Sequence, residues 1–515
     1  MRAGRWWMLA VTCLSVLVVA LDLTILNIAL PTISAALRAG TGDLQWIVDA
    51  YSLAFAAVML PAGLAGDRFG RRRLLLAGLA VFLGASAWCA LSVSAGELIA
   101  ARAAQGLGAG IVFPLSLAVV SAAFSDAERP KAVGILIAVV AAGLPLGPVM
   151  GGLLLQHFSW HSVFWINVPA VCLALGAGAA LLLESRNPAA PPLDVPGVLL
   201  SAGAVTCLVW GVIDGPERGW TAPSAWALLA GSAVLLAAFL GREHRAAHPV
   251  IDRRLFADRR FTWGTAATVA VSVALFGIMF VVPQYLQSVA GDDPISAGLR
   301  LLPMMGGLLV AGGAASPAAR AAGPRLTVAA GLALLTGGLT ILSQVHLATG
   351  YAVVAAGLAL CGLGTGTSIA AAMDQVMAAA GGDEAGAGAA LNSTLRQVGG
   401  AIAVAVLGSV LSAGYVRALD PALTALPAVD AAAARASITQ AAQLARRLPG
   451  GGPALRAAAG SAFLHGMSIV MLICAAIAVL AALTSLRYLP ARPAADTTPS
   501  PQPPATTAPP ASTRR

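Results

Sequence analysis

The chain has 515 residues, of which 58% are hydrophobic and 10% are charged, with a net charge of +9. An ordinary soluble domain has about 25% charged residues, so this composition excludes a large soluble protein. The basic residues lie in short segments between apolar runs, a distribution that sets membrane orientation and argues against a nucleic-acid-binding patch. We therefore expect an all-α polytopic membrane protein with the lipid bilayer, and no nucleic acid, as a partner.

Apolar runs of about 20 residues, which cross the hydrocarbon core as helices, recur along nearly the whole chain. Arg and Lys concentrate before the first run and after the second, fourth, sixth, eighth, tenth and fourteenth runs, which predicts that both termini are cytoplasmic. The sequence predicts fourteen transmembrane helices, at residues 7–30, 46–66, 74–94, 98–121, 132–155, 162–183, 194–213, 224–241, 261–289, 299–317, 325–345, 351–378, 390–413 and 463–487.

The spacing of these spans predicts two six-helix bundles with two helices inserted between them. Bundles repeated in this way place a substrate site near the midplane between the halves. The Pro- and Ala-rich tail is expected to be disordered. We divide the chain into an N-terminal bundle (1–183), inserted helices 7 and 8 with a cytoplasmic linker (184–260), a C-terminal bundle (261–487) with an external loop (414–462) that holds one short helix around 429–447, and the tail (488–515).

Two carboxylates and one arginine fall within the first, second and fourth spans: Asp22, Asp49 and Arg102. Burying an ionised Asp at the bilayer centre costs roughly 2.5–3.5 kcal/mol. That is comparable with the roughly 4 kcal/mol separating an ordinary carboxyl from one that titrates near neutral pH. Asp22 can therefore exchange a proton under physiological conditions, as a proton carrier must.

The rise of each helix places these three side chains at similar depth, so we expect one polar cluster in the outer half of the bundle. In that cluster Arg102 would keep a proton from being held too tightly on Asp22. The alternatives are a structural polar contact between helices for Asp22 and an interface anchor for Asp49.

A segment rich in glycine and arginine forms the short loop between the second and third spans. Glycine supplies the tight turn, and the arginines hold the loop in the cytoplasm. The acidic residue can pair with a helix N-terminus or a nearby arginine, a contact that would differ between conformations. A simple positive anchor would explain the arginines but not the acidic residue with its flanking glycines. The segment contains Gly63, Asp67, Arg68, Gly70, Arg71 and Arg72.

The fifth span carries a run of glycines and a proline. In a soluble helix each Gly would cost about 1 kcal/mol and Pro about 3 kcal/mol. A membrane bundle tolerates them, because neighbouring helices satisfy freed backbone groups and small residues permit close approach. The run therefore predicts a bent, tightly packed helix. Its members are Gly134, Gly143, Gly147, Pro148, Gly151 and Gly152.

Further polar residues lie within the apolar spans. Asp374 and Arg396 can pair between the twelfth and thirteenth spans, and a purely structural salt bridge explains them equally well. No residues have metal-ligand spacing, so we expect no metal site. Other polar side chains that can line a cavity or support the site are Asn27, Gln105, Gln284, Gln287 and Gln397.

Taken together, these segments resemble the fourteen-helix drug:proton antiporter family of the major facilitator superfamily. The loop motif departs from the family pattern at Ala65, where Leu is usual. Some multidrug members carry acidic residues in the thirteenth span for cationic drugs, and this chain has none between Leu391 and Ala413, which leaves substrate breadth open. The resemblance rests on Leu21-Asp22-x-Thr24, Asn27-x-Ala29-x-Pro31, the loop motif, Arg102-x-x-Gln105-Gly106-x-Gly108 and the glycine-proline run, which occur in the family's order.

The resemblance implies the major facilitator fold and alternating access, with inward proton flow driving outward movement of a lipophilic compound. It also implies a monomer in the bacterial cell membrane, with protons as the coupling ion and no other cofactor. Two transporters of the same fold remain as alternatives: an exporter of one endogenous metabolite and a proton-coupled importer.

Two other classes of protein fit the sequence less well. A membrane enzyme, such as a lipid-modifying transferase, would need a metal-binding carboxylate pair or a nucleophile with its base. The six His are scattered, and neither Asp-x-x-Asp nor His-Glu-x-x-His occurs. A passive channel would leave Asp22, Arg102 and the broken fifth helix without a joint explanation. We therefore expect a transporter and no enzyme.

Overall fold

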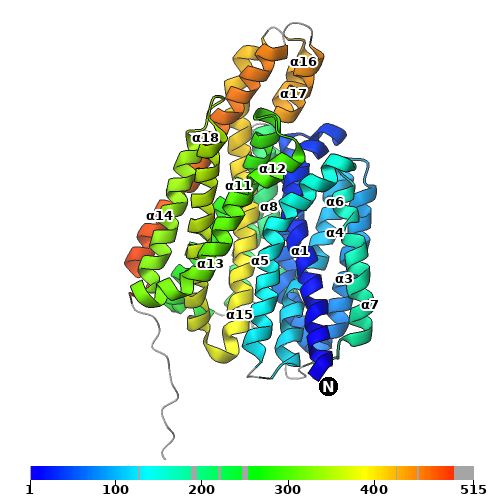
Figure 1. Ribbon diagram of the computed structural model, residues 1–515, viewed down its shortest axis with the longest axis vertical. Coiled ribbons are helices and arrows are strands. Elements are labelled where there is room, and N and C mark those ends of the chain that lie inside the picture. The colour runs from blue at the N-terminus through cyan, green and yellow to red at the C-terminus, as the bar shows by residue number, and fades with distance from the viewer. Residues whose placement is uncertain are drawn as a thin grey trace, which may run out of the picture.

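The computed structural model describes residues 2–125, 128–186, 194–218, 222–245, 253–424, 426–448 and 452–491, and all regular elements in these ranges are helices. Figure 1 shows long helices side by side, with α16 and α17 at the end opposite the N-terminus, here called the far end. Among the described residues, twelve helices are long and apolar enough to cross a membrane. The prediction of an all-α polytopic protein is thus confirmed, while the count of fourteen and the orientation stay predictions.

The N-terminal half packs through glycines where helices approach closely. A Cβ atom on Gly106 would lie 2.9 Å from Cα of Tyr51, and one on Gly108 would lie 2.6 Å from the backbone nitrogen of Phe82. These contacts draw α4 against α2 and α3, which places polar residues of α4 near the centre of the half. Its helices are α1 (Arg2–Leu37), α2 (Thr41–Phe69), α3 (Arg71–Leu91), α4 (Ala95–Ala123), α5 (Arg129–His157), α6 (Ser162–Trp165) and α7 (Asn167–Leu181).

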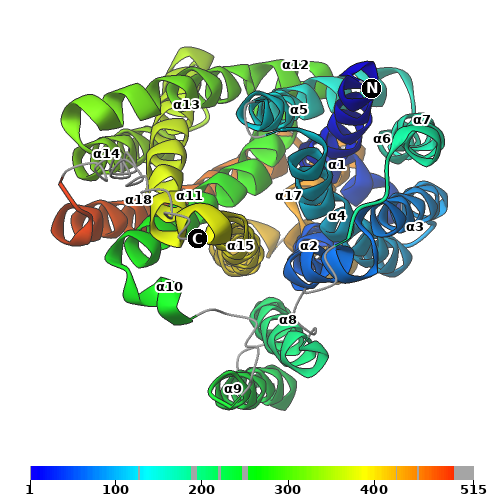
Figure 2. The same cartoon turned by 90° about the horizontal axis from the view of Figure 1, so that it is seen from below.

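The inserted pair, α8 (Val195–Arg218) and α9 (Pro223–Glu243), stands to one side of both halves, beside α2 (Figure 2). Ser232 Oγ donates to the carbonyl of Ala204 at 2.8 Å and joins the two helices. At one end Arg242 forms an ion pair of 2.6 Å with Asp194. The hydrogen bond from Arg242 holds the pKa of that carboxyl below its usual range. The short helix α10 (Arg253–Ala257) follows α9 and precedes the second half.

The C-terminal half contains one helical element, α15, that doubles back on itself. It spans 73 residues, yet Asn392 Nδ2 lies 3.7 Å from Met373 Sδ. In a straight helix these residues would be about 28 Å apart at about 1.5 Å per residue. Its two arms therefore correspond to the twelfth and thirteenth predicted spans. The half consists of α11 (Arg259–Gln284), the π-helix η1 (Tyr285–Val289), α12 (Pro294–Arg300), α13 (Leu302–Ala322), α14 (Pro324–Ser343), α15 (Tyr351–Leu423) and α18 (Gly452–Tyr488).

The predicted loop at 414–462 is mostly helical, and the one short helix predicted around 429–447 is present there as two helices. The second arm of α15 runs on to Leu423, and two helices follow, α16 (Ala428–Ala436) and α17 (Ile438–Arg447). Ser437 separates them because its backbone is extended and its side chain accepts a hydrogen bond from the backbone N–H of Gln440 at 3.2 Å. A serine in this position caps a new helix instead of continuing the old one.

At the far end, side-chain amides join the two halves. Gln45 of α2 donates to the carbonyl of Ala405 in α15 at 2.7 Å. Gln287 of η1 donates to the carbonyl of Ile28 in α1 at 2.8 Å. Helix α17 also reaches the N-terminal half, through a 3.1 Å bond from Gln440 to the carbonyl of Ala39. Because each bond crosses between the halves, this end is held together in the conformation seen here.

Candidate functional site

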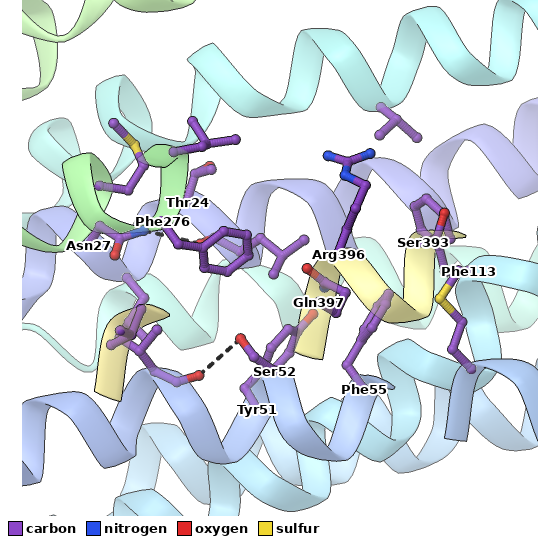
Figure 3. Close-up of a pocket in the computed structure, with 18 of the residues that line it drawn as sticks. Thr24, Asn27, Tyr51, Ser52, Phe55, Phe113, Phe276, Ser393, Arg396 and Gln397 are labelled. Carbon is purple, nitrogen blue, oxygen red and sulfur yellow. Dashed lines mark hydrogen bonds between the residues drawn. The ribbon is translucent and has the colours of Figure 1, made fainter. Parts of the chain in front are cut away.

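A cavity of about 210 Å³ lies between the two halves (Figure 3). Helices α1, α2, α4 and α5 form one wall, and α11, α13 and α15 form the other. A cavity lined by both bundles is the position expected for a substrate site in a transporter built from repeats. Its lining residues are Leu23, Thr24, Leu26, Asn27, Val48, Tyr51, Ser52, Phe55, Met59, Arg102, Phe113, Val140, Leu275, Phe276, Met279, Met305, Leu308, Ser393, Arg396, Gln397 and Val404.

Behind the α1–α4 wall of this cavity lies a buried ion pair. Arg102 Nη1 is 2.7 Å from Asp22 Oδ2, and the two residues are 2% and 1% exposed. The other carboxylate oxygen, Oδ1, accepts 2.9 Å hydrogen bonds from Gln105 Nε2 and Asn167 Nδ2. All three partners donate, so this geometry fits the ionised carboxylate. The predicted pairing of Asp22 with Arg102 is present in the structure.

Ser86 and Asn167 are two members of this network that the spacing of charged residues did not reveal. Ser86 Oγ accepts 3.0 Å hydrogen bonds from both Gln105 and Asn167, while it donates to the carbonyl of Phe164 at 3.3 Å. The two amides are thereby held in position to donate to Asp22. Asn167 begins α7, within the stretch from Phe164 to Pro169. The one sequence feature that could have identified it as part of the network is its polar amide in an apolar span.

Arg102 connects the ion pair to the cavity and to α2. Its Nε donates to the carbonyl of Ile47 at 3.3 Å, and its guanidinium carbon lies 4.2 Å from the centre of the Tyr51 ring. Both Arg102 and Tyr51 also line the cavity. A change in the charge of Asp22 would therefore alter contacts that α2 and the cavity wall share.

Asp49 is buried apart from this network. It is 0% exposed, and neither carboxylate oxygen has a hydrogen-bond partner among the described residues. Trp46 and Leu53, which lie on the same face of α2 by helical spacing, pack in an apolar cluster with Val209 of α8. The structure therefore does not join Asp49 to the Asp22–Arg102 pair by a hydrogen bond as predicted, and neighbouring positions on its helix pack against α8 and α15.

On the opposite wall, Arg396 faces the cavity from the second arm of α15. Its Nε donates to Ser272 Oγ of α11 at 3.0 Å. Asp374, its predicted partner, is exposed on the first arm and does not line the cavity. The structure thus places these two residues in different surroundings instead of bringing them together.

The amide side chains predicted to line a cavity or support the site divide into three groups. Asn27 and Gln397 line the cavity, and Gln105 belongs to the network around the ion pair. Gln284 donates to the carbonyl of Phe280 in its own helix at 2.7 Å, whereas Gln287 forms the bond to α1 at the far end. The last two are not among the lining residues.

The glycine-proline run places α5 between the two halves. A Cβ on Gly143 would lie 2.7 Å from Cβ of Ala20, Gly147 faces Thr24, and Gly151 faces Ile25, all on α1. A Cβ on Gly152 would lie 2.5 Å from the carbonyl oxygen of Pro294 in α12, and Gly298 of α12 packs against Pro148. Gly134, in contrast, has open space beside it. The predicted close packing is therefore present from Gly143 onward, and it extends across the interface between the halves.

The loop motif forms a tight turn between α2 and α3. Gly70 has φ +116°, a conformation that glycine adopts readily and other residues rarely do. Beyond it Glu184 accepts hydrogen bonds from the backbone N–H groups of Arg72 at 3.1 Å and Arg73 at 3.3 Å. A carboxylate there stabilises the N-terminus of α3, a role the sequence had not revealed. Gly63 has open space beside it, whereas the side chain of Asp67 lies outside the described residues.

The arginines of this loop occupy different surroundings. Arg68 is exposed and lies over the ring of Phe69. Arg71 Nη1 donates to the carbonyl of Ala118 in α4 at 3.5 Å, and Arg72 donates to the carbonyl of Ala179 in α7. The loop is thus attached to two further helices of the same half, so movement of any of these helices would affect it.

Comparison with known proteins agrees with this architecture. The sequence pattern of the Major Facilitator Superfamily matches residues 12–404. The chain is 34% identical over 496 residues to the tetracenomycin C resistance and export protein of Streptomyces glaucescens, covering 94% of this chain and 92% of that protein. It is 37% identical over 446 residues to the multidrug efflux pump LfrA of Mycolicibacterium smegmatis, covering 86% and 88%.

A solved structure shares the fold at much lower sequence identity. The inward-facing, unoccupied structure of a bacterial homolog to the human lysosomal transporter Spinster superposes with a TM-score of 0.66 at 15% identity. The superposition covers 95% of this chain and 98% of that one.

Proposed function

Since this chain belongs to the major facilitator superfamily, we propose that it is a proton-coupled exporter of lipophilic drugs, antibiotics or toxic metabolites. The twelve apolar helices among the described residues and the bacterial efflux relatives make it a multi-pass protein of the bacterial cell membrane. The observation that carries the proposal is the buried Asp22–Arg102 pair beside a cavity lined by both halves. It unites a titratable group with the surface that a substrate would contact.

In the proposed cycle, Asp22 gains and loses a proton while the cavity opens to alternate sides of the membrane. Protonation removes the charge that Arg102 compensates, which frees the guanidinium to change its contacts with Ile47 and Tyr51. Because Arg102 and Tyr51 line the cavity, the proton and the substrate act on the same wall. Substrate binding and protonation can therefore favour different conformations, as coupled exchange requires.

Asp49 is proposed as a second proton site. An unpaired ionised carboxylate would be strongly unfavourable in its apolar surroundings, so the buried form seen here is taken to be neutral. Trp46 and Leu53, one helical turn from it, pack in a cluster with α8 and α15, and α2 is joined to α15 through Gln45, so separation of the halves would admit water near Asp49. The alternative is an interface anchor, in which case loss of the carboxyl would leave coupling intact.

The close contacts of α5 supply a place at which the halves can separate and rejoin. Gly152 and Pro148 of α5 meet Pro294 and Gly298 of α12 with no intervening side chain. Larger residues would hold these backbones apart. We propose that this contact seals the cavity on one side during each cycle.

The proton gradient is a sufficient source of energy. One charge crossing a potential of 100 mV supplies about 2.3 kcal/mol. At roughly 150 mV, one proton would therefore sustain a gradient of a few hundredfold for a neutral substrate. We propose that no other cofactor takes part, that the chain acts as a monomer without nucleic acid, and that it is a transporter and not an enzyme. A dedicated metabolite exporter or an importer of the same fold remains the alternative.

Transport into everted membrane vesicles tests the proposal. Vesicles containing the full chain should accumulate a fluorescent lipophilic drug when acidified inside, and addition of nigericin should abolish the accumulation. Asp22→Asn vesicles should show no response to the pH gradient. Gradient-driven accumulation that persists in Asp22→Asn would exclude Asp22 as the coupling residue, and uptake insensitive to nigericin and to membrane potential would exclude proton coupling altogether.

A further inference from the structure

The charges that face the cavity are unbalanced. Among the described lining residues, two are arginines, Arg102 and Arg396, and none is Asp or Glu. Arg102 is compensated by Asp22 at 2.7 Å, behind the wall. Arg396 has no such partner, since its hydrogen bond within the described residues goes to the neutral hydroxyl of Ser272 at 3.0 Å. The cavity therefore presents one uncompensated positive charge.

This charge lies where a ligand can reach it. Arg396, Gln397 and Ser393 project from one stretch of α15 toward the space between the halves (Figure 3). Among the described residues, only Nε of Arg396 has a hydrogen-bond partner, so the terminal nitrogens of its planar guanidinium are available as donors. Two parallel N–H donors match a carboxylate or a similar planar anion. Removing a cation from water without a counter-charge is costly, and an anionic ligand would offset that cost.

The rest of the lining suits flat aromatic rings. Tyr51, Phe55 and Phe113 come from the N-terminal half and Phe276 from the C-terminal half, so aromatic side chains stand on both walls. Rings of this kind pack face to edge or in offset stacks. Three methionines fill the intervening surface with flexible, polarisable side chains that adapt to ligands of different outline: Met59, Met279 and Met305.

We propose that the cavity selects aromatic compounds that carry a carboxylate or an acidic phenol, with Arg396 as their charge partner, over cationic compounds of the same shape. This inference deepens the proposed export function and rests on it for its physiological meaning. Ser272 is a positioning residue, because its bond to Nε orients the guanidinium. The bound anion restores neutrality between α11 and α15, while the aromatic rings hold the body of the ligand.

The test uses three fluorescent ligands with one ring system: anthracene-9-carboxylate, anthracene-9-carboxamide and (anthracen-9-ylmethyl)trimethylammonium. Their affinities for the purified full-length protein are measured by fluorescence anisotropy. The carboxylate should bind most tightly and the ammonium compound most weakly. Arg396→Gln should weaken the carboxylate about tenfold or more and the carboxamide less than about threefold. Arg300→Gln, which removes an arginine paired with Asp292 outside the cavity, is the matched control and should keep the wild-type ranking.

Three results would overturn the inference: no measurable binding of the carboxylate, a trimethylammonium ligand bound as tightly as the carboxylate, or an unchanged carboxylate affinity in Arg396→Gln. The wild-type ranking tests the preference for anionic ligands even if Arg396→Gln fails to fold. Vesicle transport of the same ligands is measured separately. The predicted ranking without gradient-driven export would refute the proposed function alone, whereas export of drugs without the ranking would refute the ligand class alone.

Discussion

Replacing Asp22 by Asn should reveal how strongly the buried ion pair holds the N-terminal half. In the structure three N–H donors, from Arg102, Gln105 and Asn167, converge on two carboxylate oxygens. Asparagine keeps the shape of the side chain but has one oxygen and one NH2 group. The NH2 group must face at least one of these donors, and the charge of Arg102 is left buried without a partner.

The expected magnitude follows from burial. Arg102 is 2% exposed, and removing one partner of a buried pair costs about 3–5 kcal/mol. That corresponds to two to nearly four orders of magnitude in a folding equilibrium. Asn167→Ala removes one neutral donor and retains the ion pair, so it should cost only about 1–3 kcal/mol. We therefore predict that Asp22→Asn loses more stability than Asn167→Ala.

Denaturation of the purified protein in detergent measures both effects. The double variant Asp22→Asn/Arg102→Gln removes both charges. The stability that it loses should therefore be smaller than the sum of the losses in the two single variants by well over 0.5 kcal/mol. An Asp22→Asn protein as stable as wild type, or single losses that simply add, would refute the reasoning that the pair is buried and mutually compensating.

Three further variants test the packing, each by a measured shift. Gly152→Ala places a Cβ 2.5 Å from a backbone oxygen of α12, and this overpacking should cost about 1–3 kcal/mol and slow transport, whereas Gly134→Ala, with open space, should leave transport unchanged. Gly70→Ala forces φ +116° on a residue with a side chain and should lower thermal stability by about 1–3 kcal/mol, unlike Gly63→Ala. Gln45→Ala removes bonds between the halves and should favour their separation at the far end by about 1 kcal/mol, which spin labels there would report as longer distances. Unchanged distances would contradict that role.

The parts of the structure that could be predicted from sequence depend on helix length and depth. Apolar runs predict long membrane-spanning helices, and helix rise places Asp22 and Arg102 at a common depth, where they pair at 2.7 Å. Helix rise says nothing about rotation around the helix axis. For that reason Asp49 is predicted to join the pair, although neighbouring positions on its helix pack against α8 and α15. Arg396 was likewise assigned to Asp374, although it contacts Ser272 across the bundle.

Other features depend on contacts between segments far apart in the sequence. Asn167 and Ser86 meet at Asp22 only because α3 and α7 pack beside α1 and α4, and no local pattern encodes that arrangement. The helical content of the 414–462 segment is higher than predicted, because Ala-rich sequence interrupted by proline is typical of a loop. In the structure Ser437 supplies a helix cap, and Tyr415 donates to the carbonyl of Ala434 at 2.8 Å to hold the segment down.

Proton movement driven by substrate tests the central claim most directly. Proteoliposomes holding the purified chain and an internal pH dye are given a gradient of a transported aromatic drug, with no initial pH gradient. Substrate flow should drive protons in the opposite direction, and Asp22→Asn proteoliposomes should show no proton movement. Drug flow through the wild-type protein without any change in internal pH would contradict the account.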